Sequence, residues 1–119
     1  MIAPAGKTIA VVDDDPLIRE SLAALLEAYG YAVQGFATGP EFLAARLPNG
    51  SCVLLDVKMP LCSGPDVLDR LRERGPGTLP VILITGGLPQ HHEGSRACLR
   101  KPIRPEELLA EIDRAFAAP

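Results

Sequence analysis

The chain has 119 residues, of which 47% are hydrophobic, which suits one domain over residues 1–119. Its formal net charge of −3 argues against direct nucleic-acid binding by this domain. No run approaches the roughly 18 apolar residues of a membrane span, and residues 1–7 do not resemble a signal peptide. Cys52, Cys62 and Cys98 lack metal-like spacing and favour free thiols in a reducing compartment, so we expect a cytoplasmic protein without a membrane partner.

The first expected strand covers residues 8–13 and is almost wholly apolar until it enters a run of three aspartates, Asp13 to Asp15. A short apolar run of this kind is typical of a strand that is covered on both faces of a parallel sheet. Asp15 can cap the helix that follows, with Pro16 at its first position, and Gly30 ends that helix.

The rest of the chain continues this alternation of apolar runs and amphipathic stretches, which is typical of βα units. The further elements expected in chain order are a strand at 31–36, a helix opened by a Thr38–Glu41 capping box, a strand at 51–56, a helix from about Pro65 that is stopped at 75–77, a strand at 80–85, an aperiodic stretch at 86–96, a short strand at 97–100 and a helix from about Pro105. Five strands with helices between them predict a small, doubly wound α/β domain with a five-stranded parallel sheet.

Two of these strands end in carboxylates, the first at Asp13 with Asp14 next to it and the third at Asp56. The carboxyl ends of parallel strands line the ligand crevice of such a sheet, so these acids are expected to gather there. Like charges raise one another's pKa, and a hard cation bound by oxygens relieves that repulsion. The pattern therefore predicts a Mg²⁺ site. Asp14 is expected to bind the ion directly and Asp13 through water, while Asp56, alone at its strand end, can act as a nucleophile toward a phosphoryl group.

Four short motifs at consecutive strand ends resemble those of the receiver domain of two-component response regulators. They are Val11 to Asp15, Leu55 to Pro60 with Gly64, Ile84 to Gly86, and Lys101-Pro102. The resemblance covers nearly the whole chain and in its first half is closest to receivers of the nitrogen-fixation regulator type. It implies the flavodoxin-like receiver fold with strand order 2-1-3-4-5.

The resemblance also implies roles for individual residues. Asp56 would be the phosphoacceptor and a metal ligand, and the backbone carbonyl of Lys58 would complete the Mg²⁺ ligands. Thr85 and Lys101 would contact the phosphoryl oxygens, and the Lys101-Pro102 peptide would be cis. The phosphodonor would be a histidine kinase or a histidine phosphotransfer protein. The receiver could stand alone, signal to a fused or separate effector such as a DNA-binding domain, or belong to a hybrid kinase. Such a domain catalyses only its own phosphorylation and dephosphorylation and is otherwise no enzyme.

Two departures from the family lie after the fourth strand. Lys101 comes only 16 positions after Thr85, so we expect the fourth helix of the family to be a single turn or missing. Cys98 stands where the family has Tyr or Phe, which puts the usual output face and dimerisation through it in doubt. We take the 86–96 stretch as the candidate switching element.

Two other functions are compatible with parts of this pattern. A pseudo-receiver, an interaction module without phosphate, would fit Cys98 and the shortened segment but not the intact acids. A dehalogenase-type phosphatase would use Asp13 and Asp15, but Leu17 stands where that class has Thr or Val. His91 and His92 are interpreted as part of a solvated loop rather than as metal ligands.

Overall fold

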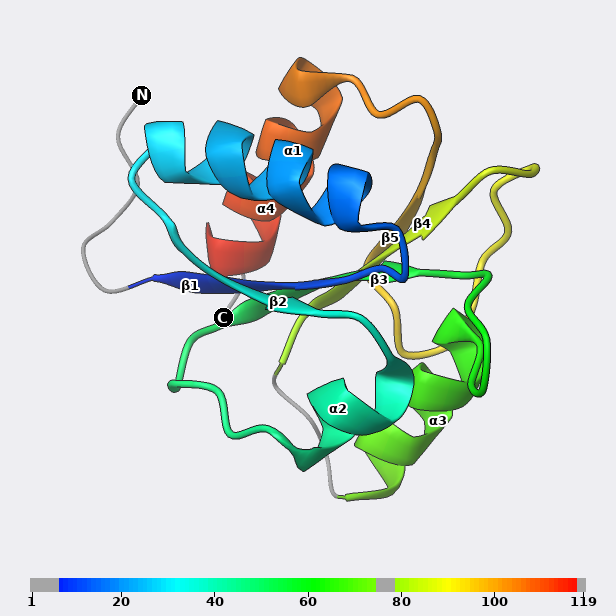
Figure 1. Cartoon of the computed structure of the whole chain (residues 1–119). Helices are drawn as coiled ribbons and strands as arrows, with labels where there is room; N and C mark the ends of the chain where they lie inside the picture. The colour runs from blue at the N-terminus through cyan, green and yellow to red at the C-terminus, as the bar shows by residue number, and fades with distance from the viewer. Residues whose placement is uncertain (1–6, 75–78, 118–119) are drawn as a thin grey trace.

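A sheet of five parallel strands organises the residues that the computed structural model describes, 7–74 and 79–117 (Figure 1). The elements are β1 (Thr8–Val12), α1 (Pro16–Ala28), β2 (Ala32–Phe36), α2 (Gly39–Ala44), β3 (Cys52–Asp56), α3 (Gly64–Glu73), β4 (Val81–Thr85), β5 (Ala97–Arg100) and α4 (Pro105–Ala117). The strand order is β2-β1-β3-β4-β5, with every neighbouring pair parallel. The doubly wound fold and the strand order are confirmed. The expected helix stop at 75–77 lies outside the described residues.

The two faces of the sheet carry separate hydrophobic cores. Along β1, Ile9 and Val11 pack with α1 and α4, whereas Ala10 and Val12 pack with α2 and α3. Figure 1 shows the two pairs of helices on opposite sides of the sheet. Because β1, β3 and β4 are covered on both faces, all of their residues are buried, which explains their continuous apolar runs. Within the described residues no helix is long and apolar enough to cross a membrane.

Side-chain caps begin three of the helices near the carboxyl edge of the sheet. Asp15, Thr38 and Ser63 each accept a hydrogen bond from a backbone N–H two or three residues further on, at 2.9–3.2 Å. A proline follows in the first turn of each helix. The caps at Asp15 and Thr38 are confirmed, and Ser63 is a cap that the sequence reading missed.

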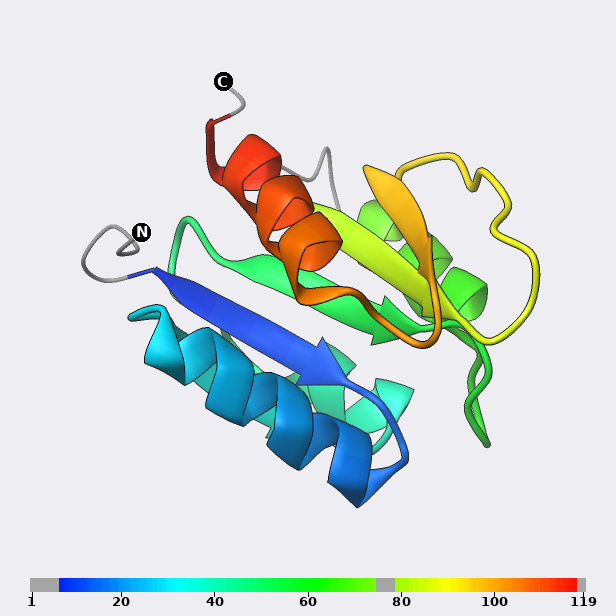
Figure 2. The same ribbon diagram turned by 90° about the horizontal axis from the view of Figure 1, so that it is seen from above.

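The connection between β4 and β5 contains no helix (Figure 2), and all of its residues, 86–96, are described. The expectation of a short or missing fourth helix is therefore confirmed, and α4 of this chain is the helix that follows β5. Arg72 of α3 holds this connection against the helix by hydrogen bonds: its Nη2 donates to the carbonyl oxygens of Gly94 at 2.6 Å and Leu79 at 2.9 Å. Gly94 has a φ of +91°, a conformation that side chains rarely adopt.

Loss of this arginine is expected to loosen the connection. In Arg72→Met, the hydrogen-bonded amides of Ser95 and Arg96 should exchange with deuterium about tenfold faster, because hydrogen bonds from a charged donor are removed. Hydrogen exchange read by mass spectrometry measures this. Arg70→Met, on an exposed position of the same helix, should leave these amides unchanged. Equal exchange in both variants would show that Arg72 does not hold the segment.

Candidate functional site

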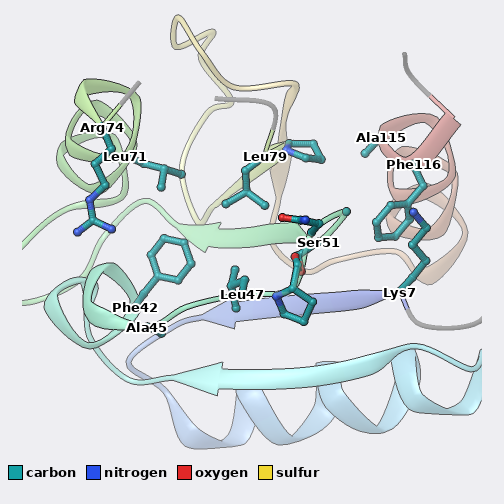
Figure 3. A pocket seen from close by; sticks show the side chains of 14 residues that line it. Lys7, Phe42, Ala45, Leu47, Ser51, Leu71, Arg74, Leu79, Ala115 and Phe116 are labelled. Atoms are coloured by element: carbon teal, nitrogen blue, oxygen red, sulfur yellow. The ribbon is translucent and has the colours of Figure 1, made fainter. Parts of the chain in front are cut away.

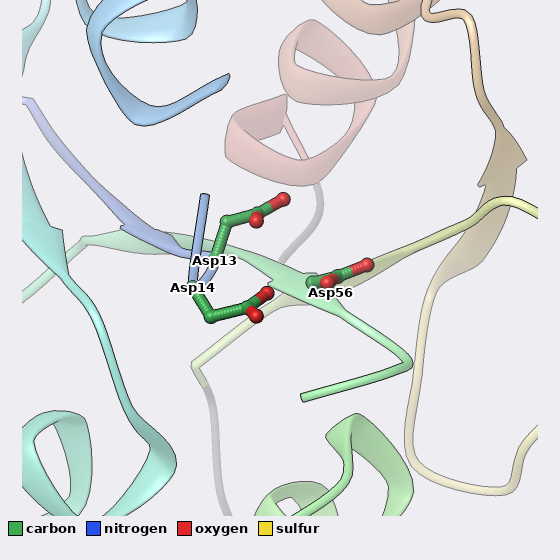
Figure 4. A group of neighbouring side chains, drawn as sticks. All are labelled: Asp13, Asp14 and Asp56. Carbon is green, nitrogen blue, oxygen red and sulfur yellow. The ribbon is translucent and has the colours of Figure 1, made fainter. Parts of the chain in front are cut away.

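Three carboxylates meet at the carboxyl edge of the sheet (Figure 4). Asp13 follows β1 and Asp56 is the last residue of β3, and the two strands are paired with Val12 opposite Leu55. With Asp14 they form a group in which one oxygen of each residue lies within 4.8 Å of the others. Asp13 and Asp56 are only 3% and 5% exposed, whereas Asp14 is exposed. The structure thus brings together the acids that the sequence predicted to meet.

The turn after β1 is fixed by its own hydrogen bonds. The N–H of Asp13 donates to the Phe36 carbonyl at 3.1 Å, which extends the ladder between β1 and β2 by one residue. Oδ1 of Asp13 accepts from the N–H of Asp15 at 2.9 Å. One carboxylate oxygen of Asp13 therefore holds the turn, and Oδ2 is left for the site.

Lys101, which directly follows β5 at the same edge of the sheet, reaches this group of carboxylates. Its Nζ lies 3.2 Å from Oδ1 of Asp56 and 3.4 Å from Oδ2 of Asp13. Its backbone N–H donates to the Thr85 carbonyl at 2.7 Å, which fixes the residue next to β4. The Lys101-Pro102 peptide is cis, as the resemblance implied. Lys101 therefore joins the ends of β1, β3 and β5 in one cluster.

Burial and the neighbouring charges shift the pKa values of Asp56 and Lys101. Burial and then the charge of Asp13 raise the pKa of Asp56, although the hydrogen bond and charge of Lys101 oppose this. Burial lowers the pKa of Lys101, but its contacts with Asp56 and Asp13 outweigh burial, so the pKa is raised overall. One ammonium group thus faces three carboxylates. A set of oxygen ligands with excess negative charge fits a hard divalent cation such as Mg²⁺.

Asp56→Asn is expected to stabilise the metal-free protein at neutral pH. Because the native pKa of Asp56 is raised, the native state binds this proton more tightly than the unfolded state does. The free energy of unfolding therefore falls as the pH rises from the ordinary aspartate range through the native pKa. At pH 7 the variant should melt about 3 °C higher, and this gain should vanish in acid. Thermal melts in EDTA across pH measure it; Asp69→Asn, at an exposed position, should show no such pH dependence.

Thr85 ends β4 at the same edge, beside β3 in the sheet, and is 8% exposed. Its Oγ1 accepts from the N–H of Gly87 at 3.1 Å, which leaves its own hydroxyl proton free to donate. A Cβ added at Gly86 would meet nothing within 4 Å, so there is open space next to Thr85. Lys58, two residues beyond Asp56, is exposed. The roles of these residues remain predictions.

Gly64, at the start of α3, lies against the backbone of the phosphoacceptor candidate. Its N–H donates to the Val57 carbonyl at 2.8 Å. A Cβ added here would collide with the Asp56 carbonyl oxygen and lie 2.9 Å from Cα of Val57. The motif at residues 55–64 included this glycine, but no local pattern indicates that only a hydrogen atom fits here against Asp56. Arg19, which donates to the Asp13 carbonyl at 2.7 Å, was missed altogether.

The residues that depart from the family lie beside Thr85. Cys98 is half-buried and lines a cavity of about 240 Å³ with Val57, Thr85 and His92. Among the described residues, the only group of potential metal ligands is that of the three aspartates, so neither histidine belongs to one. All three cysteines are free, as expected.

A larger cavity of about 430 Å³ lies at the opposite, amino edge of the sheet (Figure 3). Lys7, Ser51 and Pro80, which line it, immediately precede β1, β3 and β4. The acids stand at the other ends of these strands, so this cavity is not part of their site.

Residues 9–113 match the family model of the response regulator receiver domain. This chain belongs to the response regulator receiver family. It is 38% identical over 116 residues to the tetrathionate response regulatory protein TtrR of Salmonella typhimurium, and the match covers 92% of this chain and 56% of TtrR. It is 42% identical over 84 residues to the transcriptional regulatory protein FixJ of Azorhizobium caulinodans, over 70% of this chain and 39% of FixJ. The receiver thus spans about half the length, or less, of these curated relatives.

Solved receivers share the fold. The receiver domain of a sensor histidine kinase from Pseudomonas aeruginosa, solved with a magnesium ion coordinated in its active site cleft, superposes with a TM-score of 0.84 at 26% identity. The match covers 96% of this chain and all of that one. The recognition from sequence is confirmed: this is a signalling domain of two-component systems rather than a classic enzyme, and the findings favour neither alternative function.

Proposed function

We propose that this receiver is switched by transfer of a phosphoryl group from a phosphohistidine to Asp56. A carboxylate oxygen of Asp56 would attack phosphorus, the P–N bond would break, and its electron pair would pass to the imidazole of the donor. The observation that supports this most is the position of the buried Asp56 carboxylate, 3.2 Å from Nζ of Lys101 at the open edge of the sheet. The chain would catalyse only this transfer and the later hydrolysis of the acyl phosphate.

Asp14, Asp13, Asp56 and the carbonyl of Lys58 would hold Mg²⁺. When bound, the ion supplies positive charge that offsets the charge of the incoming phosphoryl group. The group of three carboxylates supports this assignment, as does the magnesium ion in the related receiver.

Lys101 and Thr85 would contact the phosphoryl oxygens. Nζ of Lys101 already lies between Asp13 and Asp56, so it would neutralise charge on an oxygen bound to Asp56. The Thr85 hydroxyl, whose proton is free, would donate a hydrogen bond to a second phosphoryl oxygen, and the space next to Gly86 leaves room for the group.

Incubation with acetyl phosphate and Mg²⁺, read by intact mass, tests this proposal. The wild-type chain should gain the mass of one phosphoryl group, and Asp56→Asn should gain none. Asp69→Asn, which removes an exposed carboxylate from α3, should behave like the wild type. No gain in the wild-type chain with any phosphodonor would favour the pseudo-receiver instead.

The phosphodonor protein would dock on an apolar groove beside Lys101. The groove has a volume of about 530 Å³ and lies between α1 and the segment after β5, where Leu17, Leu25 and Ile103 line it with Lys101. Leu17 is 71% exposed and lines this groove together with other apolar side chains, and a continuous exposed apolar patch of this kind is typical of an interaction site. A histidine kinase or phosphotransfer protein seated here would stand next to Asp56.

Leu17→Glu is expected to slow phosphorylation by a phosphohistidine protein about tenfold, because a charge then faces the apolar partner surface. Phosphorylation by acetyl phosphate should be unchanged, since that small donor needs no docking surface. Leu88→Glu, at another exposed leucine, should affect neither reaction. Both rates follow from radiolabel transfer, and an equal loss with both donors would rule out a docking role.

We infer that residues 1–119 form one cytoplasmic receiver domain whose signal passes to an effector, such as the DNA-binding part of a transcriptional regulator, because the matched relatives are about twice its length. The 86–96 segment, which lies between Thr85 and β5 in place of a helix, would carry the signal.

A further inference from the structure

Arg19 stands at a position where a helix disfavours a cation. It is the fourth residue of α1, and the aligned peptide dipoles make a helix N-terminus positive. Its guanidinium is turned back onto the preceding turn, where Nη1 donates to the Asp13 carbonyl oxygen at 2.7 Å. This short hydrogen bond with a charged donor offsets the unfavourable position.

The side chain reaches that carbonyl by passing over the edge strand β2. A Cβ added at Gly35 would lie 3.6 Å from Cδ of Arg19, so the arginine stem runs along backbone that carries no side chain. Gly35 is paired with Val11 of β1, just before the acidic turn. An alanine at position 35 could be accommodated, whereas a longer side chain would occupy the path of the arginine.

The bond from Arg19 acts on Asp14 through the backbone. The carbonyl of Asp13 and the N–H of Asp14 belong to one planar peptide unit, so a fixed carbonyl also fixes the direction in which Asp14 leaves the turn. The carboxylate of Asp14 is exposed and accepts no hydrogen bond from the residues that the structure describes. Its place beside Asp13 and Asp56 is therefore set by the backbone.

We infer that Arg19 is a positioning residue for the metal site: it fixes the Asp13–Asp14 peptide and thereby aims the Asp14 carboxylate at the cation. This inference rests on the proposed Mg²⁺ role of Asp14. It differs from a purely electrostatic role in the sign of its effect, because a nearby positive charge by itself weakens the binding of a cation.

Calorimetric titration with Mg²⁺ separates the two roles. Arg19→Met keeps an unbranched stem over Gly35 but loses the donor, and its affinity for Mg²⁺ should fall about tenfold, as for other residues that orient metal ligands. Arg19→Lys should recover part of the loss. Arg70→Met removes the same charge at an exposed position on α3 and should bind as the wild type does. Equal or tighter binding by Arg19→Met would overturn the inference.

Three further measurements keep the test decisive. In metal-free protein, the NMR amide signals of Asp14 and Asp15 should shift and broaden in Arg19→Met, and unchanged signals would overturn the inference even if the variant binds Mg²⁺ weakly. Gly35→Leu, which keeps Arg19 but blocks its path, should reproduce the loss of affinity; wild-type affinity would contradict the proposed route. If Asp14→Asn binds Mg²⁺ as tightly as the wild type, the assignment of Asp14 fails, whatever Arg19 does.

Discussion

Lys101→Met is expected to slow phosphorylation of Asp56 by acetyl phosphate at least about 100-fold, the usual effect of removing one donor that stabilises developing charge. Nζ of Lys101 lies within 3.4 Å of both Asp56 and Asp13. The loss of Lys101 has two effects on the reaction. The phosphoryl oxygens lose a cation, and the pKa of Asp56, which Lys101 holds down, rises further, so that less of the nucleophilic carboxylate is present.

The measurement is the rate of mass gain in acetyl phosphate and saturating Mg²⁺ between pH 5 and 8. Lys58→Met is the matched control, because this exposed lysine is two residues from Asp56 but is expected to serve the site only through its backbone. It should phosphorylate within about twofold of the wild type. A Lys101→Met protein that reacts at the wild-type rate would remove Lys101 from the mechanism.

Gly64→Ala is expected to cost about 3 kcal/mol of unfolding free energy and to lower the melting temperature by about 10 °C. The added methyl group would overlap the carbonyl oxygen of Asp56 and lie 3.1 Å from its carbonyl carbon. The overlap is costly because these are backbone atoms, which cannot rotate away as the end of a flexible side chain can. Either α3 moves away from β3 or the end of β3 moves. Both shifts would displace Asp56 from Lys101, so phosphorylation should also slow.

Gly86→Ala is the control for stability, because its added methyl group would meet nothing within 4 Å. Its unfolding free energy should stay within about 0.5 kcal/mol of the wild type. Urea denaturation of the three proteins gives the comparison. A Gly64→Ala protein as stable as Gly86→Ala would mean that the contact between α3 and Asp56 is loose.

The sequence was sufficient for the sheet and its acids because both rest on local patterns. Uninterrupted apolar runs mark strands covered on both faces, and a parallel sheet gathers whatever follows such strands at one edge. The missing helix between β4 and β5 followed from the short spacing between Thr85 and Lys101, compared with the spacing in the family. The resemblance was needed to bring Lys101 to Asp56, since nothing in the residues near position 101 points to a partner 45 positions earlier.

The contacts that the sequence reading missed depend on the routes of long side chains. Arg19 passes over Gly35 to reach Asp13, and Arg72 crosses from α3 to the carbonyl of Gly94. Each joins residues whose proximity exists only after the sheet and helices have packed. A cation in the first turn of a helix was the one local sign of the first contact.

The division of the core by the sheet has a consequence for how such a protein can evolve. Leu22 and Ile103, beside the groove that we propose for the phosphodonor, pack in the core under α1 and α4, whereas Cys98 packs in the core under α2 and α3. Substitutions in separate, non-touching clusters tend to have independent effects. If the groove and the 86–96 segment have their proposed roles, substitutions that change the phosphodonor surface on one face should leave the response on the other face undisturbed.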